Sequence, residues 1–176
     1  MAKTITALAT PPGIGGLAVI RLSGEDAIPI ADKCFEGTIK LSDAKPNTIH
    51  FGKIINDGKL IDTVTAAVFH TPKSYTGENT VEISCHGGML VASDIIGLMI
   101  ENGAVMAEPG EFTKRAFLNG KLDLTQVEAV ADIIHSASTK GYQTAARQLA
   151  GEFTNRIKDL RQKLLDACSL LELELD

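Results

Sequence analysis

The sequence predicts an α+β protein in which a sheet-and-helix part, residues 1–120, precedes a helical part, residues 121–176. Runs typical of strands, separated by turn residues, dominate the first part. Beyond it, turn residues become rare and apolar residues recur with the 3.6-residue period of a helix. The chain has 176 residues, of which 44% are hydrophobic, so it can build a substantial core.

Charge and cysteine content narrow the function classes. The net charge of −5 argues against sequence-independent clamping of nucleic acid, which needs a basic surface. The cysteines Cys34, Cys85 and Cys168 are odd in number and far apart, so we expect neither a disulfide framework nor a metal site. We see no signal-type leader and no run of about 18 apolar residues, and therefore expect a cytoplasmic protein without a membrane segment.

Two strands are expected near the N-terminus, at residues 4–10 and 17–22. The second is apolar at nearly every position, which predicts a strand that is covered on both faces. Arg21 is the exception. A charge at this position is either paired or bound to an anion, because burying it alone is costly, or it extends to water from the strand end.

A helix is expected after these strands, starting near Ser23 and Asp26. Its apolar face would comprise Ala27, Ile30, Ala31 and Cys34, with Pro29 marking the first turn. Residues 36–47 are polar and rich in turn residues, and we expect a surface loop there.

A β-hairpin is predicted at residues 49–55 and 60–69, because Asp57-Gly58 between two such runs is a strong turn signal. His50 and His70 stand at its strand ends, and we interpret both as ordinary surface histidines.

The next strand is expected at residues 79–86. Alternation places Val81, Ile83 and Cys85 on one face and Glu82 on the other. Cys85 and His86 then point in opposite directions and cannot easily form a nucleophile–base pair. Glu82 is either solvated on an open face or fixed to accept two parallel N–H bonds from a ligand.

Gly87-Gly88 turns the chain into a predicted helix at residues 89–101, buried through Val91, Ile95 and Leu98. Such a glycine pair either binds an anion at the helix N-terminus or forms only a tight turn. No glycine segment of the chain matches a dinucleotide fingerprint or a P-loop. Gly120-Lys121 is not part of a P-loop, because Leu122 follows it where a P-loop has Ser or Thr.

Residues 108–134 are expected to form two helices around a tight turn. The first spans 111–118 and ends at Asn119-Gly120. Lys121 follows this stop, as a solvated turn lysine or as a ligand contact. We expect Thr125 and Glu128 to form a capping box for the second helix. Its buried face would be Val127, Val130, Ala131 and Ile134.

Helical periodicity continues at residues 139–149, and Gly151 is expected to interrupt it. A long helix follows, with an apolar seam of Phe153, Ile157, Leu160, Leu164, Cys168, Leu171 and Leu175 that needs partner helices. The basic residues of this part are scattered around the helices, so we interpret them as solvated.

Several motifs together resemble one family. They are Ala-Thr-Pro-Pro-Gly-x-Gly-Gly at 9–16, Arg-Leu-Ser-Gly at 21–24, Ser-Tyr-Thr-Gly-Glu at 74–78, Glu-x-x-x-His-Gly-Gly at 82–88, Pro-Gly-Glu-Phe-Thr-x-Arg-Ala-Phe-Leu-Asn at 109–119 and Lys-Leu-Asp-Leu-Thr-Gln-x-Glu-Ala at 121–129. They are similar to the N-terminal part of the tRNA modification GTPases MnmE, also called TrmE, and cover the whole chain.

The resemblance implies an N-terminal mixed-sheet domain, residues 1–120, that resembles the folate domain of aminomethyltransferases, binds 5-formyltetrahydrofolate and forms a homodimer. Residues 121–176 would be the first helices of an all-α helical-bundle domain. The family's G domain, which uses GTP, Mg²⁺ and K⁺, and its C-terminal catalytic motif have no counterpart in this sequence. Cys168 is therefore not the family's catalytic cysteine. The full protein would work with the flavoprotein MnmG, as a heterotetramer, to modify C5 of the wobble uridine of tRNA.

By the same resemblance, the folate contacts are Arg21, Glu82 and Lys121, and the segment holds no catalytic or metal-binding residue of its own. Two alternatives remain open at this point. The chain could be a structural module that docks the GTPase and the tRNA without binding folate. It could also be a folate-dependent aminomethyl or formyl transferase, although an apolar seam without partners disfavours an enzyme that acts alone.

Overall fold

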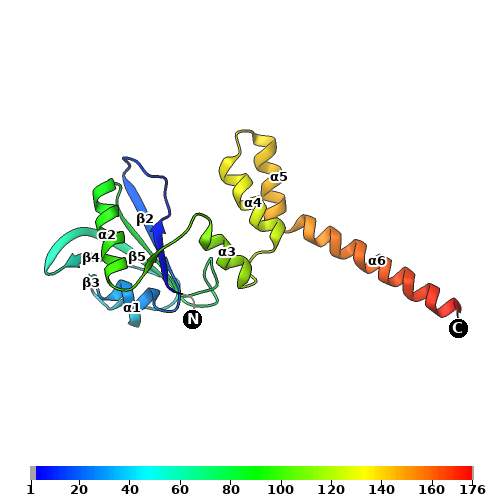
Figure 1. Ribbon diagram of the computed structural model, residues 1–176, viewed down its shortest axis with the longest axis horizontal. Coiled ribbons are helices and arrows are strands. Elements are labelled where there is room, and N and C mark those ends of the chain that lie inside the picture. The colour runs from blue at the N-terminus through cyan, green and yellow to red at the C-terminus, as the bar shows by residue number, and fades with distance from the viewer. Residues whose placement is uncertain (1–2, 176) are drawn as a thin grey trace. The chain divides into compact units, whose positions relative to one another are not determined.

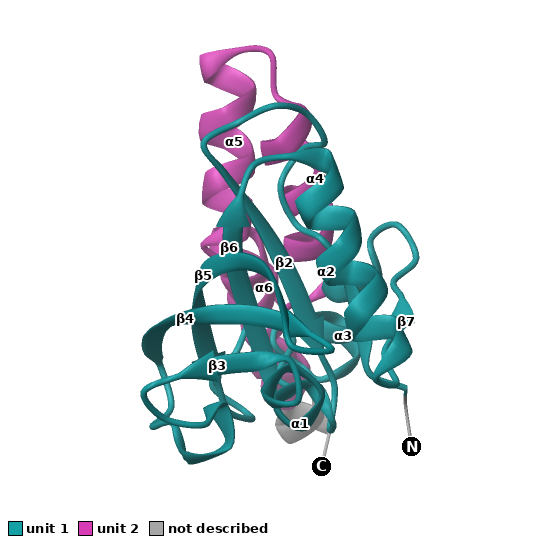
Figure 2. Cartoon of the chain, turned by 90° about the vertical axis from the view of Figure 1, so that its left-hand side faces the viewer, with its two compact units in different colours: residues 1–121 teal, residues 122–176 magenta. Residues whose placement is uncertain are grey.

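The computed structural model describes residues 3–175, with side chains described as far as residue 171. The chain divides into two compact units, residues 1–121 and 122–176, which are coloured separately in Figure 2. The first unit contains a sheet with helices and the second contains only helices, so the predicted α+β fold followed by a helical part is confirmed.

The sheet of the first unit has seven strands in the order β3-β4-β5-β6-β2-β1-β7. It is mixed, because β1 and β7 run parallel while every other neighbouring pair is antiparallel. The strands are β1 (Ile5–Leu8), β2 (Leu17–Ser23), β3 (Phe35–Gly37), β4 (Thr48–Asn56), β5 (Lys59–Phe69), β6 (Thr80–His86) and β7 (Val105–Met106).

Helices α1 (Ala27–Asp32) and α2 (Met89–Glu101) pack with one face of this sheet to form the core (Figure 1). Ile20 and Leu22 of β2 and Val81 and Ile83 of β6 are fully buried there. On the other face of β2, Val19 and Arg21 are only half-buried, so the prediction that this strand is covered on both faces along its length is wrong. An alternating strand in an antiparallel sheet buries one face, and Leu17 at the strand end is 69% exposed.

The predicted helix start at Ser23 is also wrong. Ser23 is the last residue of β2, and α1 begins four residues later, with Pro29 in its first turn. The predicted loop at 36–47 contains the end of β3 and a short 3-10 helix, η1 (Leu41–Asp43), whose Leu41 is fully buried. Neither element was predicted, because this stretch is rich in turn residues and has no regular apolar period.

The hairpin of β4 and β5 and the strand β6 follow the predictions. Asp57 and Gly58 both have positive φ, 47° and 76°, as a two-residue hairpin turn requires. In β6, Val81, Ile83 and Cys85 are buried, whereas Glu82 lies on the more open face and His86 is exposed.

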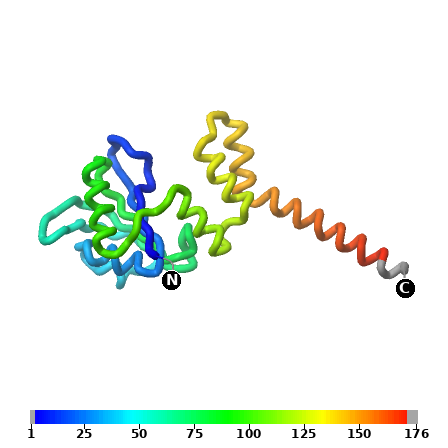
Figure 3. Tube along the Cα trace, in the orientation of Figure 1, coloured from blue at the N-terminus to red at the C-terminus, as the bar shows by residue number. Residues whose placement is uncertain are grey.

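Position 87, just before α2, has no room for a side chain because another backbone segment passes close to it. The N–H of Gly15 donates to the carbonyl of Gly87, and a Cβ on Gly87 would lie 2.3 Å from the Gly15 oxygen. In Figure 3 the segment at 9–16, in blue, returns beside the start of α2. Close approach of two backbones therefore explains this glycine without a bound anion.

Helix α3 (Glu111–Leu118) completes the first unit and matches the predicted range. It ends at Asn119, and Gly120 adopts a positive φ of 69°, as the Asn-Gly signal predicts. Lys121 follows, and its backbone N–H donates to the carbonyl of Ala116.

The second unit comprises α4 (Leu124–His135), α5 (Thr139–Leu149) and α6 (Glu152–Leu175). The capping box of α4 is formed by Asp123 and Gln126, so the prediction of Thr125 and Glu128 is wrong. Thr125 instead donates to Oδ1 of Asp123 at 2.6 Å. Two residues capable of capping stand close together, and the carboxylate accepts more hydrogen bonds than the hydroxyl.

The predicted buried face of α4 is wrong as well. Ala131 and Ile134 are exposed, Ile134 to 72%, and the fully buried residue is Ala129. On α5 the buried residue is Ala145. Small side chains let α4 and α5 approach closely, while Val127 and Val130 are only half-buried and Leu124 is exposed.

Gly151, with φ of 81°, separates α5 from α6 as predicted. The apolar seam of α6 is exposed among the residues whose side chains are described; Leu164, for example, is 60% exposed. Within that described part, no helix is both long and apolar enough to cross a membrane.

Candidate functional site

Arg21 and Glu82, which the sequence singled out, form an ion pair on the more open face of the sheet. The two residues lie directly opposite each other in β2 and β6. Nε of Arg21 donates to Oε1 of Glu82 at 2.8 Å, and Nη2 lies 2.7 Å from the same oxygen. The side chains are 22% and 27% exposed. Of the alternatives for Arg21, the structure supports pairing rather than extension into water.

This pairing uses only part of each group. Among the described residues, Nη1 of Arg21 and Oε2 of Glu82 take part in no hydrogen bond. One donor nitrogen of the guanidinium and one acceptor oxygen of the carboxylate therefore remain for a ligand. Such a pair can bind a polar ligand edge without first breaking its own contact.

Two aromatic rings lie over the guanidinium of Arg21. The guanidinium carbon is 5.0 Å from the ring centre of Tyr75 and 5.4 Å from that of Phe112. These distances are within the range of a cation–π contact. The hydroxyl of Tyr75 is 2.9 Å from Oγ1 of Thr113, so the ring on the loop is tied to α3. Sequence reasoning did not assign either ring to the site.

Lys121, which follows α3, packs against the loop that carries Tyr75. Its Nζ donates to the carbonyl of Pro72 at 3.1 Å, and its aliphatic carbons lie against Gly77. A Cβ on Gly77 would be 3.2 Å from Cγ of Lys121, and Gly77 has a φ of 79°. The side chain of Asn119 donates to the carbonyl of Thr76, so the turn after α3 is held on this loop.

A network around Arg115 joins α3 to the same loop. Its guanidinium donates to Glu78 at 3.1 Å and to Glu111 at 2.9 Å, and it is almost fully buried. Glu78 also accepts a hydrogen bond from the buried hydroxyl of Ser23 at 2.7 Å. A hydrogen bond from the Glu108 N–H lowers the pKa of Glu111, and Arg115 lowers it further against the effect of burial. No pattern in the sequence indicates this network, because Glu78 belongs to a turn-rich loop.

At the far end of β6, His86 is paired with Asp62. Nδ1 of His86 is 2.7 Å from Oδ1 of Asp62, and the His86 backbone N–H donates to Oδ2. Burial alone would raise the pKa of Asp62, but these two hydrogen bonds hold it below its ordinary value. Cys85 is buried and His86 is exposed, which confirms the prediction that the two side chains point to opposite faces of β6. Burial also raises the pKa of the Cys85 thiol.

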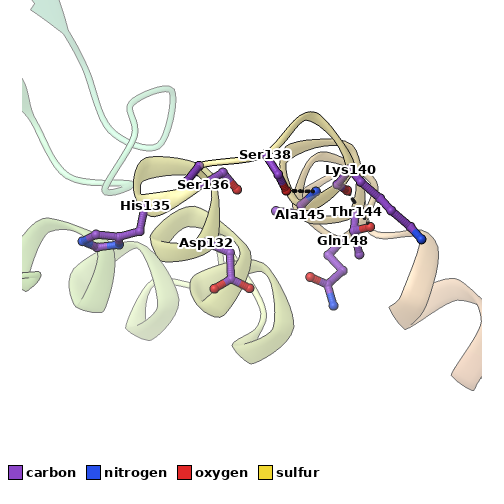
Figure 4. Close-up of a pocket in the computed structure, with 10 residues that line it drawn as sticks. Asp132, His135, Ser136, Ser138, Lys140, Thr144, Ala145 and Gln148 are labelled. Carbon is purple, nitrogen blue, oxygen red and sulfur yellow. Dashed lines mark hydrogen bonds between the residues drawn. The ribbon is translucent and has the colours of Figure 1, made fainter.

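Two cavities lie away from the ion pair. One, of about 570 Å³, lies between α4 and α5 and is lined by polar side chains, including Asp132, His135 and Lys140 (Figure 4). In that view His135 and Lys140 extend in opposite directions, so their charges do not converge. A second cavity, of about 220 Å³, is largely apolar and lies between Gly13 and Met89. No group of three or more metal-ligating side chains occurs among the residues that the structure describes.

The structure thus brings Arg21 and Glu82 into direct contact and connects Lys121 to them through one loop. Residues 72–78 carry both the carbonyl that binds Lys121 and the ring that covers Arg21. Arg21 and Lys121 therefore both contact this segment, Glu82 is joined to it through Arg21, and the segment is also bound to α3.

The chain is similar to one family along almost its whole length. The family model described as "GTP-binding protein TrmE N-terminus" matches residues 4–121, and the model described as "MnmE helical domain" matches residues 124–176. Proteins named tRNA modification GTPase MnmE are 51% identical over 176 residues in Flavobacterium johnsoniae, 51% over 174 residues in Salinibacter ruber and 45% over 175 residues in Chlorobaculum tepidum. Each alignment covers 98% of this chain but only 37% or 38% of the relative.

Proposed function

The chain belongs to the MnmE family of tRNA modification GTPases, and we propose that it is the folate-binding, dimerising N-terminal portion of such an enzyme. The sequence spans just over a third of the length of the relatives that it matches. In this proposal the whole protein works with the flavoprotein MnmG on the wobble uridine of tRNA, and GTP hydrolysis takes place in a separate G domain. The bound one-carbon folate supplies the carbon for the group at C5 of the uridine.

The observation that carries the proposal is the half-exposed Arg21–Glu82 pair beneath two aromatic rings. Its unpaired carboxylate oxygen, Oε2 of Glu82, suits the N–H donors of a reduced pterin. Tyr75 and Phe112 add flat apolar surface next to it, as small-molecule sites commonly do. The donors and acceptors of the site therefore fit the pterin end of a folate.

Lys121 suits the other end of the same ligand. Its ammonium group is exposed and bound by only one carbonyl among the described residues, so it can also bind a carboxylate of the glutamate tail. The homodimer, MnmG and tRNA remain proposed partners that rest on family membership.

Calorimetric titration with 5-formyltetrahydrofolate tests this function. Glu82→Gln keeps the side-chain size but removes the charge, and we expect a loss of affinity on the order of tenfold to a hundredfold, because hydrogen bonds to charged groups are the stronger ones. Lys121→Ala should also weaken binding while leaving stability nearly unchanged, because an exposed turn lysine contributes little to folding.

Ser84→Ala is the matched control, because Ser84 lies two residues along β6 and is half-buried like Glu82. Its affinity should equal that of the wild type. Unchanged affinity in Glu82→Gln would remove the pterin role. No folate binding by the wild-type chain would favour a docking module instead.

A further inference from the structure

We propose that a basic face of the second unit, made by Lys140, Arg147, Arg156 and Lys163, binds the phosphate backbone of an RNA. This inference rests on the proposed function, which includes tRNA as a partner but assigns it no surface on this chain. None of the four residues belongs to the ion-pair site.

Positive charge is concentrated in one stretch of an otherwise acidic chain. The whole chain has a net charge of −5, whereas residues 138–163 contain six lysine or arginine residues and two acidic ones. The six are Lys140, Arg147, Arg156, Lys158, Arg161 and Lys163. Among the described residues, none of these six side chains forms an ion pair. Their charges are therefore available to an anionic partner.

The fold of the second unit brings two of these cations together. Arg147 of α5 and Arg156 of α6 line one cavity of about 260 Å³. The uncharged side chains of Thr144 and Gln148 line the same cavity, and one carboxylate, that of Glu152, also borders it. Two guanidinium groups and one carboxylate leave the cavity with a net positive charge.

Each arginine continues a basic row along its own helix. Lys140 lies seven residues before Arg147 on α5, and Lys163 lies seven residues after Arg156 on α6. Residues with this spacing share one side of a helix and lie about 10 Å apart along its axis. Figure 4 shows Lys140 extending away from Asp132 of α4, and the two form no ion pair. Two short rows of cations therefore meet at the cavity.

The basic face stays open when other helices cover the apolar residues of this unit. On α5 the buried residue is Ala145, whereas Lys140 and Arg147 are exposed. On α6, the helical period places Arg156 and Lys163 on one flank of the apolar seam. Long basic side chains at the edge of an apolar surface keep their charged groups in water. Partner helices that bury the seam would therefore leave these cations accessible.

The chemistry of this face suits a phosphate backbone. A guanidinium binds a phosphate through two parallel N–H bonds, and a hydroxyl or amide such as those of Thr144 and Gln148 adds contacts to phosphate or sugar oxygens. A repeating backbone also supplies an anion to each row of cations. Among polyanions we choose RNA, because the 45–51% identical relatives are named tRNA modification GTPases.

Fluorescence anisotropy with the whole chain and an unmodified tRNA transcript tests this inference, at KCl concentrations between about 50 and 200 mM. Each phosphate contact makes binding depend more steeply on salt, because its formation releases a counterion. In Arg147→Gln/Arg156→Gln, we expect the affinity at the lowest salt to fall about tenfold or more. The slope of log affinity against log salt should decrease by about one for each lost contact.

Lys158→Gln/Arg161→Gln is the matched control. It also removes two positive charges, but from the opposite flank of the α6 seam. Its affinity for the transcript should stay within about twofold of the wild type. Both double variants should keep the wild-type helical content by circular dichroism, because all four residues are exposed. Glu152→Gln removes the carboxylate at the cavity and should raise the affinity about threefold.

Three results would overturn the inference. Equal losses in the two double variants would show that binding follows net charge alone. A wild type that binds a poly-glutamate peptide as tightly as the transcript would show that the face does not select RNA. A wild type that binds no tRNA at the lowest salt would show that no such surface exists.

Calorimetric titration of the same variants with 5-formyltetrahydrofolate separates this inference from the proposed folate function. Arg147→Gln/Arg156→Gln should bind the folate as the wild type does, because neither residue belongs to the ion-pair site. Folate binding without tRNA binding would refute the basic face alone. Binding of tRNA through this face without folate binding would refute the folate function alone.

Discussion

The two units of the chain use their apolar residues in different ways. In residues 1–121, the large aliphatic side chains of the sheet face are buried, and Ile20, Leu22, Val81 and Ile83 have no exposed surface. In residues 122–171, the fully buried side chains are two alanines, Ala129 and Ala145. Apolar residues recur regularly in both units. In the first unit they are buried between the sheet and its helices, whereas on α6 the described ones are exposed.

This difference shows what a hydrophobic period can predict. It identifies the face of an element that is suited to burial, whereas burial itself depends on a partner of matching shape. The sheet supplies that partner for α1 and α2. For the seam of α6, the family resemblance predicts further helices of the helical domain as the partner.

The largest effect should come from the core of the first unit. Ile83→Ala removes a fully buried side chain and leaves a cavity, so we expect a loss of about 2–5 kcal/mol in the free energy of unfolding. Urea unfolding followed by circular dichroism measures this loss. A change below about 0.5 kcal/mol would mean that the sheet core is not the main source of stability in this unit.

A smaller effect is expected at the Arg115 network. Arg115→Ala leaves Glu78 and Glu111 without their cation, and we expect a loss of about 2–3 kcal/mol because both carboxylates keep some contact with water. The substitution should also increase hydrogen exchange in residues 72–78, which the network ties to α3. Exchange that stays as slow as in the wild type would show that the loop is fixed by other contacts.

In the second unit, the cap of α4 should make stability depend on pH. Hydrogen bonds from the hydroxyls of Thr125 and Thr154, followed by that from the Gln126 N–H, lower the pKa of Asp123 to about 2. A lowered pKa means that the carboxylate stabilises the folded state above its ordinary pKa of 3.8 and loses this effect as the pH falls towards 2.

At pH 5, Asp123→Asn should therefore lower the free energy of unfolding of α4 by about 1 kcal/mol. Between pH 4 and 2, the stability of α4 in this variant should depend less on pH than in the wild type. Amide exchange of Gln126 at several pH values measures both effects. If the exchange rate of the Gln126 amide depends on pH in the same way in the variant and the wild type, the Asp123 carboxylate is not responsible for the pH dependence.

The smallest effect is expected on the exposed seam. Leu164→Ala should change the free energy of unfolding of this chain by less than about 0.5 kcal/mol, because Leu164 is 60% exposed. Compared with Ile83→Ala in the same urea experiment, it tests the contrast between the units directly. A loss above about 2 kcal/mol would show that the seam is buried in solution, for example by self-association.

The sequence predicted most elements but fewer contacts between them. Asp57-Gly58 located the hairpin and Asn119-Gly120 the end of α3, because both signals depend on local backbone conformation. The cap at Asp123 was missed because Thr125 stands two residues away and suits the same role. Local composition could not show which of the two the helix would use.

The candidate site was predicted in part for a similar reason. Strand alternation places Glu82 on the open face, but only the register of β2 and β6 shows that Arg21 lies opposite it. Tyr75 and Phe112 are separated from Arg21 by 54 and 91 positions in the sequence, and no periodicity connects a loop residue with a strand. Such contacts depend on tertiary structure.

A crystal structure of this chain with bound 5-formyltetrahydrofolate tests the central claim most directly. The account predicts that Oε2 of Glu82 lies within hydrogen-bond distance of an N–H group of the pterin, with the Arg21–Glu82 pair unbroken and Lys121 near the glutamate tail. A folate bound elsewhere, or one whose pterin ring contacts neither Arg21 nor Glu82, would contradict it.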